Sequence, residues 1–186
     1  MNWYVVLIRG INVGGKNKMP MTELRQFLGE LDFTDVATYI QSGNVLLRSK
    51  LSSEKVQQVI EDMLPKKFTV DSELIKVLVL SHNQLKSIVT SAPKGFGAKP
   101  DTFHSDVIFL MNIGVDEALK VFSPKEGIDC IWPGDRVIYS QRLSAERVKS
   151  RLNKIVGTQA YKSMTIRNWN TTTKLLALLD SMNSDK

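Results

Sequence analysis

The residues with the clearest chemical potential are the glycines and cations of one short stretch, Arg9–Lys18, which directly follows an apolar run. Gly10, Gly15 and Lys16 have the spacing G-x-x-x-x-G-K of a nucleotide-binding P-loop, in which backbone N–H groups surround the phosphates and the lysine neutralises their charge. A P-loop also needs a serine or threonine hydroxyl for Mg²⁺ after the lysine, and Asn17 stands there instead. The helical pattern also starts several residues too late, so the stretch is predicted not to be an NTPase loop.

The same stretch still has the residues for simple binding of an anion. The glycines allow positive φ and close approach of the backbone to a ligand, and the cations around them favour an anion. The predicted anion-binding residues are Arg9, Asn12, Gly14, Gly15, Lys16 and Lys18. The alternative is a glycine-rich connector whose lysines are only solvated.

A second polar stretch, Thr38–Val45, contains the turn signal Ser42-Gly43-Asn44 between two apolar runs. Strand alternation places Tyr39 and Gln41 on one face. The predicted binding residues here are Tyr39, Gln41, Ser42 and Asn44. The alternative is a plain hairpin turn.

A third stretch near the C-terminus places a cation, two amides and an aromatic ring together in Arg167, Asn168, Trp169 and Asn170. This set suits stacking on, and hydrogen bonding to, a base or an amide. The alternative is that Asn168 or Asn170 only caps the last helix. The three stretches form one pocket if that helix packs back on the first half of the chain.

Motifs for catalysis and metal binding are missing from the sequence. It contains no H-x-x-H, C-x-x-C or H-E-x-x-H spacing, so no metal site is predicted. His82 and His104 have no nucleophile motif beside them. Cys130 lies in a predicted strand beside Ile131 and is predicted to be part of the core. No catalytic residue and no cofactor is predicted.

Hydrophobic periodicity indicates the elements that must position these residues. The first half alternates apolar runs with i, i+3, i+4, i+7 patterns, which predicts the order β-α-β-β-α-β followed by one more helix. The predicted ranges are a strand at 3–8, a helix from Pro20 to Leu31, a hairpin of 36–41 and 45–49, a helix from Ser52 or Ser53 to Leu64, a strand at 74–80 and a helix at 83–90.

The same order restarts after an irregular stretch. The predicted ranges are a strand at 107–111, a helix at 115–122, a hairpin of 128–132 and 137–141, a helix from Ser144 to Ile155, a strand at 164–167 and a final amphipathic helix. The segments Val45–Leu64 and Val137–Val156 also align without gaps, with Val, Leu, Ser, Glu and Val identical at corresponding places. We therefore predict an α+β protein of two ferredoxin-like units, each followed by an extra helix. The predicted domains are 1–92 and 105–186, with 93–104 as the connector.

The charge balance favours an anionic partner. The 186 residues include 25 Lys and Arg against 19 Asp and Glu, a net charge of +6, which favours nucleotides, nucleic acid or acidic proteins. One cysteine excludes an intrachain disulfide and fits a reducing compartment. No apolar run approaches the roughly 20 residues that cross a bilayer. We therefore expect a cytoplasmic protein without a membrane partner, and the oligomeric state stays open.

Three motifs give the chain a family resemblance. RGINVGG, TYIQSGNV and RNWNT, the last followed by an amphipathic helix, resemble a bacterial family of unknown function along essentially the whole chain. Ile166 and Thr172 depart from the last motif of that family, where Thr and Val are usual. The resemblance implies a duplicated ferredoxin-like α+β fold and no established activity, so it transfers no catalytic residue.

Three functions follow from these patterns. The first is binding of a phosphate-bearing anion, either a nucleotide or nucleic acid, through the glycine-rich loop. RNA recognition in the manner of ferredoxin-like RNA modules is disfavoured, because only Tyr139 offers a stacking aromatic on the relevant strand. The second is an enzyme that uses the same loop as a clamp on a small phosphorylated or amide substrate, with a titratable base near Lys16. The third is a protein-interaction or assembly module with an exposed sheet edge.

Overall fold

The structure is a computed structural model that describes residues 1–71, 73 and 75–184. The chain forms two compact units: unit 1 comprises Met1–Lys86 and the C-terminal segment from Leu175, and unit 2 comprises Ser87–Lys174. The predicted division at a connector of residues 93–104 stays a prediction. Among the described residues, none of the helices combines the length and the hydropathy that crossing a bilayer requires.

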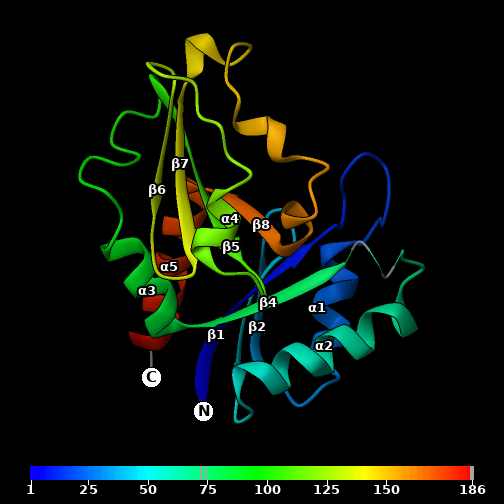
Figure 1. The fold of residues 1–186 in the computed structure, drawn as a ribbon. Coiled ribbons are helices and arrows are strands. Elements are labelled where there is room, and N and C mark those ends of the chain that lie inside the picture. The colour runs from blue at the N-terminus through cyan, green and yellow to red at the C-terminus, as the bar shows by residue number, and fades with distance from the viewer. Residues whose placement is uncertain (72, 74, 185–186) are drawn as a thin grey trace. The chain divides into compact units, whose positions relative to one another are not determined.

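The first sheet has the strand order β2-β3-β1-β4, with every neighbouring pair antiparallel. Figure 1 shows its strands and the helices that follow them. The elements are β1 (Asn2–Arg9), α1 (Met21–Gly29), β2 (Thr34–Tyr39), β3 (Asn44–Ser49), α2 (Ser53–Lys67), β4 (Lys76–Ser81) and α3 (His82–Thr90). Leu74, which was predicted to begin the fourth strand, lies outside the described residues. The order and the pairing are those of a ferredoxin-like unit.

Helices α1 and α2 pack on one face of this sheet (Figure 1). Alternate strand residues meet the apolar faces of these helices in one core. The core includes Val6, Ile8, Leu24, Leu28, Val45, Leu47, Val56, Ile60 and Leu64. Each fully buried side chain of this kind contributes about 1.5–3 kcal/mol relative to exposure. The hydroxyl of Ser52 accepts a hydrogen bond from the Lys55 N–H at 3.4 Å and caps α2, as the sequence predicts. Helix α1 differs, because it follows Pro20 and no side chain caps it.

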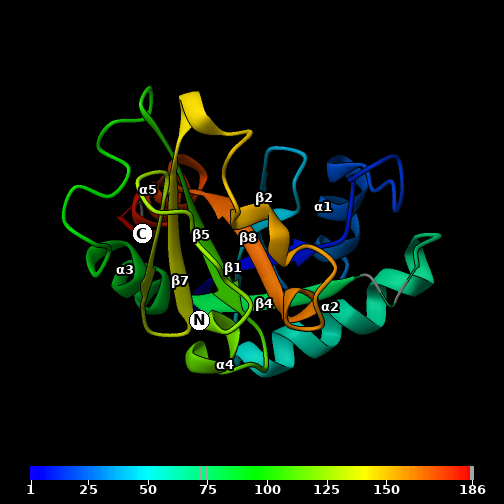
Figure 2. The ribbon, with the colours of Figure 1, turned by 45° about the horizontal axis from the view of Figure 1, so that its top comes forward.

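The second sheet repeats this architecture strand for strand, with the order β6-β7-β5-β8 and antiparallel neighbours (Figure 1). Figure 2 shows β7, β5 and β8 from a second direction. The elements from this half of the chain are β5 (Phe103–Leu110), α4 (Val115–Leu119), β6 (Asp129–Pro133), β7 (Val137–Leu143), β8 (Met164–Asn168) and α5 (Trp169–Ser184). The predicted fold class of two duplicated ferredoxin-like α+β units, each followed by a helix, is confirmed.

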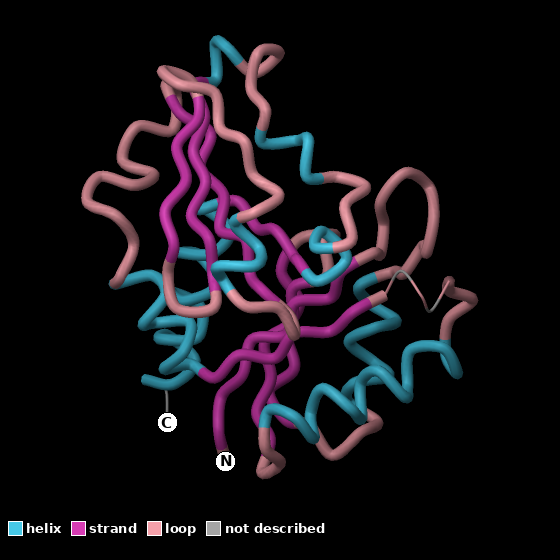
Figure 3. The backbone as a smooth tube through the Cα atoms, viewed as in Figure 1, coloured by secondary structure: helices cyan, strands magenta, loops and turns pink. Residues whose placement is uncertain are grey.

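The helix predicted from Ser144 to Ile155 is wrong. Two short 3-10 turns, Ser144–Glu146 and Leu152–Ile155, stand in its place, a third, Ala160–Ser163, follows beyond it, and Figure 3 shows the loops between them. Val148, an apolar residue in the middle of the predicted helix, is 99% exposed. The Arg151 N–H, which a helix would use internally, donates instead to the Asp129 carboxylate at 2.8 Å. This bond to a neighbouring strand outweighs the helix that the apolar periodicity predicts. The serine, asparagine and valine residues of the segment favour a helix only weakly.

The predicted core position of Cys130 is also wrong. Cys130 is exposed on β6, an edge strand of the second sheet. Strand alternation places Asp129 and Ile131 on one face and Cys130 on the other. The sequence could not show which face of this edge strand would be covered.

Tyr139 offers a test of packing in unit 2. Its side chain is 1% exposed, its ring meets Phe96 at 5.4 Å between centroids, and its hydroxyl donates to the Ile88 carbonyl at 2.7 Å. Burial, with a smaller effect from the charge of Asp135, raises the pKa of Tyr139 to about 12. We expect Tyr139→Phe to lower the free energy of unfolding by about 1–3 kcal/mol, because it leaves a buried carbonyl without its donor.

The pH dependence of this loss checks its cause. The pKa of Tyr139 is raised in the folded state. Its contribution to the free energy of unfolding is therefore fully present below the unfolded-state pKa of about 10 and is lost as the pH rises towards 12. Urea unfolding of both proteins at rising pH should therefore show the gap narrowing above pH of about 10. A gap that stays constant would contradict the assignment.

Candidate functional site

The glycine-rich loop after β1 is held by the side chain of Asn12. Its amide nitrogen donates to the carbonyls of Met19 at 2.9 Å and Gln41 at 3.0 Å, and its oxygen accepts from the Met19 N–H at 2.8 Å. Asn12 itself has a positive φ of 53°, which asparagine tolerates better than most residues. The side chain that was predicted to bind a ligand therefore joins the loop to the β2–β3 hairpin.

Asn17 explains why the loop lacks the hydroxyl of a P-loop. Its amide nitrogen donates to the Gly10 carbonyl at 2.9 Å, and its oxygen accepts from the Asp71 N–H at 2.8 Å. A serine or threonine could not span both contacts. Between these anchors Gly14 and Gly15 form an exposed turn with φ of 59° and 75°.

The hairpin tip packs against the start of the loop through Gly43. The Ile8 N–H donates to the Gly43 carbonyl at 2.8 Å. The buried Asn44 amide donates to the Tyr39 carbonyl at 3.1 Å and to the Ser42 hydroxyl at 2.9 Å. Asn44 and Ser42 thus shape the tip, and Gln41 is exposed beside it.

The loop and the hairpin meet at a hollow of ≈ 390 Å³ in unit 1, which we call the loop hollow. The residues around it are Asn12, Lys18, Met19, Pro20, Met21, Thr22 and Gln41. It lies at the N-terminus of α1, where unpaired N–H groups and the helix dipole favour negative charge. The structure therefore brings three predicted residues of two motifs to one place, while Lys16 is exposed on the loop and Arg9 is half-buried at its base.

The third predicted stretch belongs to unit 2, and its meeting with the loop hollow stays a prediction. Arg167 and Asn168 project from opposite faces of β8. Arg167 is buried, donates to the Thr165 hydroxyl at 3.0 Å, and has its pKa lowered by burial to about 10, so it stays charged at neutral pH.

Asn168, Trp169 and Asn170 line a second hollow of ≈ 150 Å³, which we call the edge hollow. The other residues around it are Pro100, Phe103, His104 and Ser105. Asn168 also caps α5, because its side-chain oxygen accepts from the Asn170 N–H at 3.0 Å. The capping alternative and the ligand-binding alternative therefore use different atoms of the same motif.

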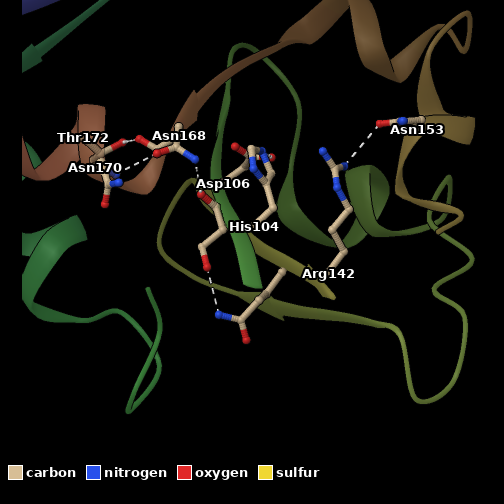
Figure 4. A network of polar contacts seen from close by, with 9 residues as sticks. His104, Asp106, Arg142, Asn153, Asn168, Asn170 and Thr172 are labelled. Atoms are coloured by element: carbon tan, nitrogen blue, oxygen red, sulfur yellow. Dashed lines mark hydrogen bonds and ion pairs between the residues drawn. The ribbon is translucent and has the colours of Figure 1, made fainter. Parts of the chain in front are cut away.

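A polar network behind the edge hollow was missed by sequence reasoning. His104 Nε2 lies 3.1 Å from Asp106 Oδ2, and Figure 4 shows this pair between Asn168 and Arg142. Burial raises the pKa of Asp106, against the opposing charges of His104 and Arg142. The available signal was a pair of titratable residues at alternate positions before an apolar run, because His104 and Asp106 precede the predicted strand 107–111.

The network continues on the same face to Asp129. Its Oδ2 accepts from the N–H groups of Lys125 at 3.0 Å and Arg151 at 2.8 Å. Burial opposes ionisation, but these bonds, a bond from Ser150 and the charge of Arg142 hold the pKa of Asp129 below its usual value. Arg142 is 9% exposed and donates to Asn153 at 3.4 Å. Within the described part of the chain, Arg142 Nε and Asp129 Oδ1 are buried without a hydrogen-bond partner.

Comparison with known proteins identifies the family. The model of the family described as "Protein of unknown function (DUF1697)" matches residues 1–139. The chain belongs to this family. A solved structure described as "conserved bacterial protein SP0830 from Streptococcus pneumoniae" is 28% identical to this DUF1697 chain, with a TM-score of 0.81 over 96% of this chain and 98% of that one. A comparison with curated proteins gave no match. The predicted family is thereby confirmed.

Proposed function

We propose that unit 1 of this DUF1697 protein binds a phosphate-bearing anion, the phosphate of a nucleotide or of nucleic acid, in the loop hollow. One observation carries the proposal: the uncapped N-terminus of α1 opens onto a hollow that Lys18 lines. The occupant is a phosphate because both features favour a compact negative charge that accepts several hydrogen bonds.

The local geometry supports this assignment. The first intrahelical bond of α1 runs from the Leu24 N–H to the Pro20 carbonyl at 3.0 Å, so the preceding N–H groups point out of the helix end. Proline at this position has no side chain that could accept them. Lys18 lines the hollow beside the helix end, and Gln41 supplies a polar wall from the hairpin. Lys16 does not line the hollow but adds positive charge from its exposed place on the loop.

A double substitution of the two lysines tests the proposal. We expect Lys16→Ala with Lys18→Ala to weaken binding of ATP, measured by calorimetry, by about tenfold or more. The reason is that a hydrogen bond to a charged group contributes about 1.5–3 kcal/mol. The matched control is Lys55→Ala with Lys66→Ala, which removes the same charge from the exposed side of α2. It should change binding by less than about twofold.

The probes separate the two phosphate sources. Inorganic phosphate, ATP and a single-stranded oligonucleotide are compared at low and high salt, because contacts to many phosphates give a steep salt dependence and a single phosphate gives a shallow one. Equal losses in the two double variants would mean that only net charge acts, and the site would be wrong. Failure of the wild-type protein to bind any of the three probes at low salt would contradict the proposal.

The enzyme and assembly alternatives stay predictions. Among the described residues, Asp71 is an acidic residue tied to the loop: its backbone N–H donates to Asn17 at 2.8 Å, and its carboxylate accepts from the Glu73 N–H at 3.2 Å. Conversion of a bound phosphate ester that is lost in Asp71→Asn would favour the enzyme. Concentration-dependent mass in sedimentation would favour assembly.

A further inference from the structure

The edge hollow of unit 2 lies where two strands stop pairing. β8 pairs with β5 only from Asp106 onward, so the first part of β5, Phe103–Ser105, extends beyond its neighbour. At this point the chain turns from β8 into α5, and Asn168 fixes the turn by donating to the Ser105 carbonyl at 3.1 Å. A strand edge and a helix start therefore form most of the boundary of the hollow, and Pro100 from the preceding turn completes it.

Its aromatic wall is held rigidly. The Trp169 ring meets the buried Phe96 ring at 5.1 Å between centroids in an edge-to-face arrangement. Gly97, with φ of 72°, lies directly against the indole, where a Cβ atom would overlap it. Phe103 adds a second aromatic side chain to the lining. Fixed aromatic walls favour planar ligands, because stacking then costs little conformational entropy.

In its neutral form, His104 gives the hollow a defined hydrogen-bond acceptor. Its side chain is 42% exposed and lines the hollow, while Asp106 is 16% exposed behind it. The Asp106 carboxylate only accepts, so its 3.1 Å contact with Nε2 places the proton of neutral His104 on that nitrogen. The other ring nitrogen, Nδ1, is then an acceptor.

Asn170 gives the hollow an amide. It uses its backbone N–H and carbonyl in bonds to Asn168 and Thr173, while its side chain is exposed at the hollow it lines. Asn168 has committed both ends of its side chain to the Ser105 carbonyl and the Asn170 N–H. The side chain that remains for a ligand is therefore that of Asn170.

We propose that the edge hollow binds one planar heterocycle with an adjacent ring N–H and carbonyl, the lactam edge of a nucleobase. The ring N–H donates to His104 Nδ1, the carbonyl accepts from the Asn170 amide, and the ring packs against Trp169 and Phe103. A volume of ≈ 150 Å³ admits a single ring system and excludes larger ligands, which take roughly 300 Å³ or more. The site does not depend on the loop hollow of unit 1.

Two pyrimidines of equal size test the direction of the hydrogen bond. Uracil has a ring N–H donor between two carbonyls, whereas the corresponding nitrogen of cytosine is an acceptor beside an amino group. We expect uracil to perturb the Trp169 indole signal in the ¹H–¹⁵N spectrum of the full chain and to bind more tightly than cytosine. The double variant Lys16→Ala with Lys18→Ala should bind uracil as wild type does, which separates this result from the phosphate proposal.

Single variants test the named contacts. His104→Phe keeps a ring but removes the acceptor, and Asn170→Ala removes an exposed amide; each should weaken uracil binding about threefold to tenfold. Gln159→Ala, which removes an exposed amide elsewhere in unit 2, should leave it unchanged. Asp106→Asn can either donate to or accept from His104, so the preference for uracil over cytosine should fall.

A lower preference for uracil over cytosine in Asp106→Asn is the result that a merely structural role of Asp106 would not produce. Wild type that binds neither base at millimolar concentration, or that binds cytosine as well as uracil, overturns the proposal. So does wild-type affinity for uracil in both His104→Phe and Asn170→Ala.

Discussion

Gly43→Ala is expected to lower the free energy of unfolding by about 2–5 kcal/mol, from strained backbone and overpacking together. Gly43 has φ of 72°, and a Cβ atom there would lie 2.6 Å from the Ile8 carbonyl oxygen and 2.9 Å from the Ile11 side chain. The oxygen cannot move freely, because Ile8 lies in β1 and its N–H is bound to Gly43 at 2.8 Å. The hairpin must therefore shift away from the glycine-rich loop.

Gly15→Ala is the matched control. Gly15 has nearly the same φ, 75°, but no atom lies within 4 Å of the added Cβ. It should cost only the backbone term of about 1–2 kcal/mol. Chemical denaturation gives the free energy of unfolding that each variant loses, and the difference between the two losses is the cost of the steric contact. Equal losses would contradict the close packing of hairpin and loop. If that packing forms the loop hollow, Gly43→Ala also weakens phosphate binding.

The loop shows how far sequence patterns reach in unit 1. The glycines, the turn signal and the apolar runs predict the strands, the hairpin and the two polar stretches, because these depend on local preferences. The roles of Asn12 and Asn17 were not predictable in this way. Each side chain bonds backbone groups that are distant in the sequence, Gln41 and Asp71, and residue type alone does not indicate which partner the fold will supply.

Unit 2 shows the opposite case, in which long-range contacts override a local pattern. The alignment of Val137–Val156 with Val45–Leu64 predicts a second long helix, yet only the strand part of the likeness is retained. The Asp129 carboxylate accepts from the backbone N–H of Arg151 in the following segment and so competes with helix formation. The candidate residues His104 and Asp106 were missed for a related reason: only strand pairing sets them beside Asn168 and Arg142.

Asp129→Asn is expected to destabilise unit 2 by about 2–4 kcal/mol at neutral pH, whereas Asp106→Asn should be neutral or stabilising. Both carboxylates flank the buried Arg142, but their surroundings differ. Asp129 accepts two backbone N–H bonds that favour its charge, and the neutral amide oxygen of the replacement accepts them more weakly and no longer offsets the charge of Arg142. Asp106 is disfavoured by burial, so removal of its charge relieves a cost.

The two carboxylates also predict stability gaps of opposite sign that both close in acid. The folded pKa of Asp129 is lowered, so its contribution is present above the unfolded pKa of about 3.9 and is lost as pH falls through the folded value. The gap between wild type and Asp129→Asn should therefore shrink on acidification. The folded pKa of Asp106 is raised, so the folded state takes up this proton first, and any advantage of Asp106→Asn also disappears as pH falls. Urea unfolding across the acid range measures both gaps. If Asp106→Asn proved the more damaging substitution at neutral pH, the carboxylate that compensates Arg142 would be Asp106, and the edge hollow would be built on a structural ion pair.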